Sequence, residues 1–240
     1  MTLPALDGIP EKLQALLTYD ASSPLIFSSG LFLFLFAGFM LVYSMFRRAP
    51  MARIVYVILF SLYFYYKSSG IYFLLLIFAA TSDYWIAKGI HAARSTRAKR
   101  WLVVLSVAVN LGMLAYFKYT NFLIGNLNSL LSIFHTAIPK VSLVMPLGIS
   151  FFTFQITSYL IDVYNGKTRP ARSILDLGVY LCMFPQLISG PICMYSEIQP
   201  QLKNRRVDVR LLEEGMETFV LGLSAKTLLA NPMGGLWNNL

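Results

Sequence analysis

The stretch PLGISFFTFQITSYLIDVYNG (146–166), followed after a basic turn by LCMFPQLISGPI (181–192), decides the fold of this chain. Both runs are strongly apolar, yet both carry polar side chains, and proline and glycine interrupt the second. Membrane proteins accept polar groups and broken helices at depth only where these face protein or a water-filled cavity. Each residue alone reads as a satisfied group in an ordinary helix pair, whereas the combination predicts a broken segment inside a membrane bundle.

The composition assigns the chain to a membrane class. Of its 240 residues, 57% are hydrophobic and only 13% are charged, whereas soluble domains carry about 25% charged residues. Most side chains are therefore expected to contact lipid or other protein groups and not water. We predict an all-α fold, a polytopic integral membrane helical bundle with a re-entrant broken helix. Residues 1–24 form an extracytoplasmic segment in this interpretation, and residues 25–240 belong to the transmembrane domain.

The net charge of +9 is concentrated in short connectors. Fifteen of the 20 Lys and Arg residues border apolar runs, as the positive-inside bias predicts for cytoplasmic loops. Attraction to anionic lipid headgroups explains this pattern without a nucleic-acid partner, so the expected partner is the lipid bilayer. The clusters are Arg47, Arg48 and Arg53; Lys88, Arg94, Arg97, Lys99 and Arg100; Lys167, Arg169 and Arg172; and Lys203, Arg205, Arg206 and Arg210.

The apolar runs predict about five crossings. They cover residues 25–46, 54–66, 71–87, 101–119 and 144–164. The second and third runs are joined by a polar turn at 67–70, and residues 121–134 have the spacing of an interfacial helix on the outer face. Because arginines follow the first run, the N-terminus is expected outside. A last helix begins near Leu211 and is expected to end at Gly234 and Gly235.

The run from 174 to 198 is long enough to cross, but basic clusters flank both of its ends. A single crossing would leave one cluster outside. The breaks at Phe184-Pro185 and at 189–191 predict that the segment enters, breaks and returns to the cytoplasmic side.

The residues that most often carry catalysis or bind metals are scarce. His91 and His135 lack acidic partners and are expected at the surface, and Cys182 and Cys193 lack the spacing of a zinc site. No catalytic motif and no metal site is predicted. We expect the side chain of Asp83 to reach the region of Lys88 or Arg94. We expect the Lys118 side chain to extend toward the outer face, and therefore not to form an ion pair with Asp162.

Several motifs, in order, carry a resemblance. They are FSSGLFLFLF (27–36), YFKYTNF (116–122), the 146–166 stretch, FPQLISGPI (184–192) and GLSAK (222–226). Together they resemble the membrane-bound O-acyltransferase family over about residues 25–230. The most similar branch is that of the bacterial alginate and peptidoglycan O-acetyltransferases, with the D-alanyl transfer protein of teichoic acid modification as a cousin.

The resemblance implies a funnel through the bacterial inner membrane, with an acyl donor on the cytoplasmic side and a polysaccharide acceptor outside. The donor, acetyl-CoA or an acyl carrier, is a substrate, and no bound cofactor is implied. An extracytoplasmic acetyltransferase is the expected protein partner. The family's histidines, one of them in a Trp-His-Gly-like motif, lie in the later part of a longer protein. This chain has neither motif, so we expect an N-terminal portion that carries no catalytic residue and is inactive alone.

Acyl transfer to a hydroxyl needs a general base, a polarised carbonyl and shelter from water. The expected wall of the passage comprises Gln155, Tyr159, Asp162, Pro185, Gln186, Ser189, Gly190 and Pro191. Each polar side chain could equally make a helix–helix hydrogen bond worth about 0.6–2 kcal/mol, and Asp162 could lie at the inner interface or be paired. Three functions stay open: polysaccharide O-acetylation, D-alanyl transfer to teichoic acid, and a non-enzymatic channel or transporter subunit.

Overall fold

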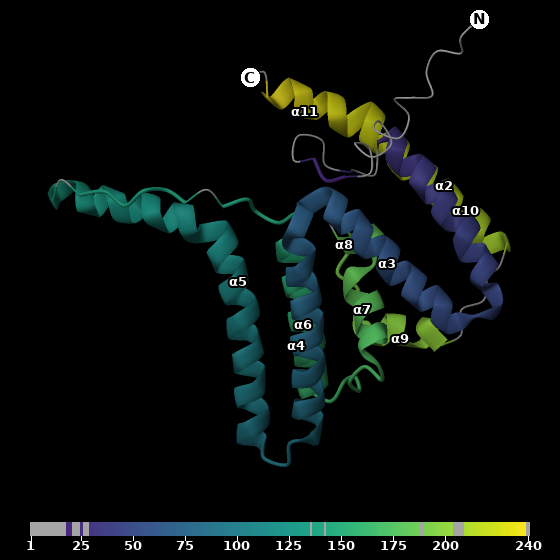
Figure 1. Cartoon of the computed structure of the whole chain (residues 1–240), viewed down its shortest axis with the longest axis horizontal. Helices are drawn as coiled ribbons and strands as arrows, with labels where there is room; N and C mark the ends of the chain where they lie inside the picture. The colour runs from purple at the N-terminus through teal and green to yellow at the C-terminus, as the bar shows by residue number, and fades with distance from the viewer. Residues whose placement is uncertain are drawn as a thin grey trace, which may run out of the picture.

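The computed structural model describes residues 18–20, 25, 29–134, 136–141, 143–187, 190–203 and 209–238. Within these residues the chain is helical and contains no strand (Figure 1). The surface position expected for His135 falls outside the described residues. The α-helices are α2 (Gly30–Met45), α3 (Pro50–Ser69), α4 (Phe73–Ala92), α5 (Thr96–Leu131), α6 (Ile149–Tyr164), α7 (Ile174–Cys182), α8 (Phe184–Leu187), α9 (Tyr195–Lys203), α10 (Val209–Ala225) and α11 (Asn231–Asn238).

The first apolar runs form α2, α3 and α4, with boundaries set by local chemistry. Ser29 caps α2 by accepting a hydrogen bond from the Phe32 backbone N–H at 3.2 Å, and α3 starts with Pro50. The polar turn expected at 67–70 is shorter than predicted, because α3 continues to Ser69. At the end of this helix Gly70 takes a positive φ, +59°, a conformation open to glycine without steric cost.

Two helical stretches are long and apolar enough to cross a membrane, namely Pro50–Ala92, which joins α3 to α4, and Thr96–Leu131, which is α5. The Gly30–Met45 helix is apolar but shorter. Helices α4 and α5 lie side by side and antiparallel, with α6 packed against both (Figure 1). Helix α3 leans away from α4 toward α2, so the described residues form two packed groups that share α3 and α7.

Two boundary predictions around α5 and α6 are wrong. The expected break between a span at 101–119 and a separate helix at 121–134 is absent, because α5 runs unbroken over 36 residues and bends instead (Figure 1). The Thr120 hydroxyl donates to the Tyr116 carbonyl within this helix, a contact that commonly bends helices. Helix α6 begins at Ile149, not at 144, because the chain turns at Gly148 with φ +74°.

The prediction for Asp83 is also wrong. Its side chain is 1% exposed and faces α5, not Lys88 or Arg94. Its carboxylate accepts hydrogen bonds from the Ser106 hydroxyl and from Asn110 Nδ2, the latter at 2.8 Å. Ser106 and Asn110 are one turn apart on α5 and so share a face. The carboxylate is therefore held by neutral donors across the α4–α5 interface.

A phenylalanine cluster fills the second group of helices. Phe184, the first residue of α8, meets Phe39 and Phe60 at centroid distances of 5.3 and 5.1 Å, and Phe32, Phe36 and Phe64 at 5.7–6.2 Å. Phe219 of α10 stacks on Phe36 at 5.6 Å, which attaches the last helical segment to α2. Aromatic pairs at such distances contribute about 0.5–1.5 kcal/mol each beyond their burial. The cluster anchors Phe184, which lies two residues beyond the end of α7.

The C-terminal helix does not end at Gly234 and Gly235. The chain passes from α10 through a five-residue π-helical turn, Lys226–Ala230, into α11, which includes both glycines. A glycine inside a helix costs only about 0.5–1 kcal/mol relative to alanine, so two of them weaken a helix without obliging it to stop.

Candidate functional site

The interruption predicted near Pro185 is present, and the polypeptide backbone explains it. Helix α7 ends at Cys182, because Met183 takes an extended ψ of 113°. In a continuous helix the Phe184 N–H would donate to the Tyr180 carbonyl. Here it donates to the Ser61 hydroxyl of α3 at 3.2 Å. The break thus leaves the Tyr180 carbonyl without its helical partner.

Two glutamines replace that partner. Gln155 Nε2 from α6 donates to the Tyr180 carbonyl at 2.9 Å, and Gln186 Nε2 from α8 donates to the same oxygen at 2.7 Å. Both side chains are buried, at 3% and 9% exposure. A buried carbonyl without a partner costs about 1–3 kcal/mol, and two convergent carboxamides remove that cost. Two predicted site residues therefore meet at one backbone oxygen.

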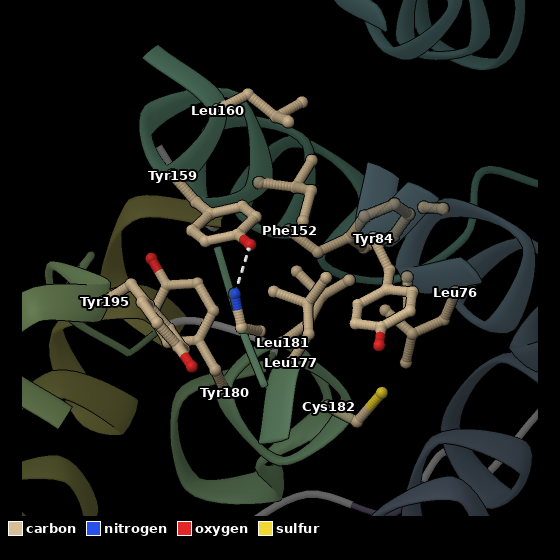
Figure 2. Close-up of a cluster of buried hydrophobic side chains, with 14 of the residues drawn as sticks. Leu76, Tyr84, Phe152, Tyr159, Leu160, Leu177, Tyr180, Leu181, Cys182 and Tyr195 are labelled. Atoms are coloured by element: carbon tan, nitrogen blue, oxygen red, sulfur yellow. Dashed lines mark hydrogen bonds between the residues drawn. The ribbon is translucent and has the colours of Figure 1, made fainter. Parts of the chain in front are cut away.

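Three tyrosines complete the cluster (Figure 2). The rings of Tyr159, Tyr180 and Tyr195 contact one another with centroid distances of 5.1–6.3 Å, and each is at most 1% exposed. The Tyr180 hydroxyl donates to the Cys193 carbonyl at 2.9 Å. The Tyr159 hydroxyl accepts from the Ala171 N–H at 3.0 Å. These contacts join α6 and α7 to the chain on both sides of the break.

The remaining predicted residues lie around this cluster. Asp162 is 8% exposed and pairs with Lys167 at 3.7 Å, five residues further along the chain. Pro185 and Pro191 are exposed and Gly190 is half-buried. Ser189 is outside the described residues.

The polar side chains of this cluster hold the backbone in place. Both carboxamides and two of the three tyrosine hydroxyls already bond to the backbone. In the described part of the chain, His, Cys, Asp and Glu form no group that could hold a metal ion. The arrangement therefore fixes the shape of a broken helix in an apolar interior.

Two features escaped the sequence interpretation. One is the Asp83–Ser106–Asn110 cluster, for which the i,i+4 spacing of Ser106 and Asn110 was the available signal. The other is a cavity of about 220 Å³ lined by Arg172, Asp176, Tyr195, Gln199 and Leu202. It lies where the start of α7 meets α9, and its two sides come from segments separated in sequence by the break, which no local pattern connects.

Comparison with known proteins identifies relatives of most of the chain. It is 35% identical over 217 residues to a probable alginate O-acetylase of Pseudomonas aeruginosa, covering 88% of this chain and 41% of that protein. It is 35% identical over 213 residues to the corresponding protein of Azotobacter vinelandii, covering 87% of this chain and 42% of the relative. The peptidoglycan O-acetyltransferase of Helicobacter pylori is 30% identical over 238 residues, covering 86% of this chain and 45% of the relative.

The chain spans about two fifths of the length of the curated relatives it matches. No protein-family model and no solved structure matches it. The chain is thus a membrane protein of the membrane-bound O-acyltransferase family, in the branch of the alginate and peptidoglycan O-acetyltransferases.

Proposed function

We propose that the chain forms the membrane scaffold of an enzyme that transfers an acetyl group from a cytoplasmic donor to a cell-surface polysaccharide. The observation that carries this proposal is the similarity to proteins named for O-acetylation of alginate and of peptidoglycan, over 86–88% of the chain. These names favour O-acetylation over D-alanyl transfer and over a channel.

The proposed topology is a multi-pass bundle in the bacterial inner membrane, with the N-terminus on the extracytoplasmic side. The long apolar helices support the crossings, and the basic clusters support the orientation. Helix α7 has nine residues, or about 13 Å, less than half of a hydrocarbon core of about 30 Å. A segment this short fits a re-entrant path better than a crossing.

A return of the chain after α8 supports the same path. Tyr195 of α9 packs on Tyr180 of α7 at 5.2 Å, so the chain reverses direction between them. Arg172, before α7, and Gln199, within α9, line one cavity. Arg172 and Gln199 therefore lie at the same end of the segment, which supports a re-entrant path.

In this proposal the broken segment walls the passage for the acyl group. Gln155, Tyr159 and Gln186 support this wall through their buried contacts, Pro185, Gly190 and Pro191 belong to the interrupted part of the chain, and Ser189 stays a sequence-based candidate. Asp162, paired with Lys167, belongs to the cytoplasmic end of α6. The donor is acetyl-CoA or an acyl carrier, and an extracytoplasmic acetyltransferase receives the group. In this proposal the catalytic histidines that the family resemblance implies are supplied from outside these 240 residues, and the chain alone is expected to lack transfer activity.

The function is tested by deleting the gene and measuring acetate released from the cell-surface polysaccharide by mild alkali. We expect the ester content to fall and to return when the complete gene is supplied on a plasmid. An unchanged ester content in the deletion strain would contradict the proposal.

The re-entrant path is tested by labelling single cysteines, Arg172→Cys and Arg205→Cys, in a Cys193→Ser background, because Cys182 is buried. A membrane-impermeant maleimide added to intact spheroplasts should leave both unlabelled and react with both after lysis. Lys140→Cys, at an exposed position expected outside, serves as the positive control. Labelling of either position 172 or 205 in intact cells contradicts the re-entrant path.

A further inference from the structure

The second half of α5 forms an arm that projects from the rest of the molecule. We define the α5 arm as residues 119–131 of α5, the following turn Ser132–Phe134 and the extended segment formed by residues 136–141 and 143–145. Figure 1 shows this part of α5 turning away from α4, with the extended chain running back along it. Most of its apolar side chains are exposed, including Phe122, Leu130 and Ile133 at 64–74%.

Two asparagines hold the extended segment to the helix. Asn121 bonds to both backbone groups of Val141, accepting from its N–H at 3.1 Å and donating to its carbonyl at 2.9 Å. Asn128 does the same with Ile138, at 2.8 Å for both bonds. Seven helical residues rise about 10.5 Å, and three extended residues cover about 10 Å. The two spacings match, so a pair of carboxamides two turns apart fixes the register of the segment.

Two serine hydroxyls of the helical part are also bonded within the arm. The hydroxyl of Ser129 donates to the Gly125 carbonyl at 3.1 Å, and that of Ser132, just beyond the helix, donates to Ser129 at 2.9 Å. Asn126 is the one side-chain amide of α5's second half with no hydrogen bond among the described residues. An element that meets lipid must satisfy its polar groups internally, and an element in water has no such need.

Charge distribution points to the same environment. From Tyr119 to Pro139 the sequence contains no Lys, Arg, Asp or Glu. The register set by Asn121 and Val141 places Lys118 and Lys140 together at the base of the arm, and both are exposed. Lysines at that position can extend their ammonium groups to lipid phosphates while the uncharged remainder lies against acyl chains.

We propose that the α5 arm, including its extended segment, is a two-layer element that rests in the phospholipid surface, held together by the Asn121 and Asn128 carboxamides. The arm is continuous with a helix long enough to cross the bilayer, so the helix bend turns the chain from the crossing into the interface. This inference does not depend on acyl transfer.

The test uses the protein expressed from its complete gene, carrying Cys193→Ser and a single fluorophore at Ile133→Cys or Val141→Cys, in nanodiscs. Brominated phosphatidylcholine should quench both fluorophores. The Asn121→Ala/Asn128→Ala variant should lose quenching at position 141 and retain it at 133, because only the extended segment is released. The matched control Asn126→Ala should leave both signals unchanged.

Three results would overturn the proposal. Fluorophores quenched by aqueous iodide and not by bromine place the arm in water. Protection from both quenchers indicates that protein covers the arm, whether a second copy or another segment. Equal quenching at position 141 with and without the two asparagines removes their role as the clamp. The measurements without Asn substitutions decide the first two outcomes even if the double variant fails to fold.

Discussion

Replacing Gly190 by alanine is expected to disrupt the broken segment between α7 and α9. A Cβ at this position would lie 2.2 Å from Gln186 Cα and 2.6 Å from Gln186 Cβ. Gln186 cannot move aside freely, because its side chain is bonded to the Tyr180 carbonyl and its own carbonyl accepts the Gly190 N–H at 3.0 Å. Overpacking commonly costs about 1–3 kcal/mol, and a clash with backbone falls at or above the upper limit.

The measurement is thermal unfolding of the purified protein in detergent, paired with polysaccharide ester content in cells. Gly190→Ala should lower the melting temperature and remove most of the ester. Gly112→Ala in α5 is the matched control, because apart from the helix's own nearby backbone and the adjoining residues nothing lies within 4 Å of the added methyl group, and alanine favours a helix. Wild-type stability and ester content in Gly190→Ala would show that the chain reversal tolerates a side chain there. A loss of stability without a loss of ester would contradict the proposal that this segment walls the acyl passage, and would leave the structural prediction for Gly190 intact.

The second large effect is expected at the α4–α5 interface. Asn110→Leu removes the donor that lies 2.8 Å from Asp83 Oδ2 and leaves a carboxylate that is 1% exposed with only Ser106. Hydrogen bonds between membrane helices contribute about 0.6–1.7 kcal/mol, but an orphaned buried group costs about 1–3 kcal/mol, and more when charged. The orphaning term is the larger, so Asn110→Leu should destabilise the protein by more than the bond alone is worth.

A double variant separates the two terms. Asp83→Leu/Asn110→Leu removes both partners and should recover much of the stability lost in Asn110→Leu, because no buried carboxylate remains. Ser82→Ala is the control, since its hydroxyl bonds only within α4, and its effect should stay within about 0.5 kcal/mol. If unfolding in detergent shows the two single effects simply adding, the buried pair is not coupled.

The places where sequence reasoning failed share a cause. Sequence spacing directs Asp83 to the basic residues one to three turns further along the chain, but the rotation of the helix points its side chain at α5. The break expected near residue 120 is a bend, because asparagine and threonine side chains meet neighbouring backbone without ending the helix. In both cases the partner lies on another element or depends on the orientation of the helix, and hydrophobic periodicity carries neither piece of information.

The sequence alone determined the helical class, the membrane character, the family and the place where the chain breaks. These follow from local physics: apolar runs need partners other than water, and Pro185 and Gly190 restrict backbone geometry where they stand. Only the tertiary structure decided which groups form hydrogen bonds with the backbone freed at the break. The Ser61 hydroxyl accepts from the Phe184 N–H, and the Gln155 and Gln186 carboxamides donate to the Tyr180 carbonyl. A freed backbone group must find a partner, but the identity of that partner is set by how distant helices pack.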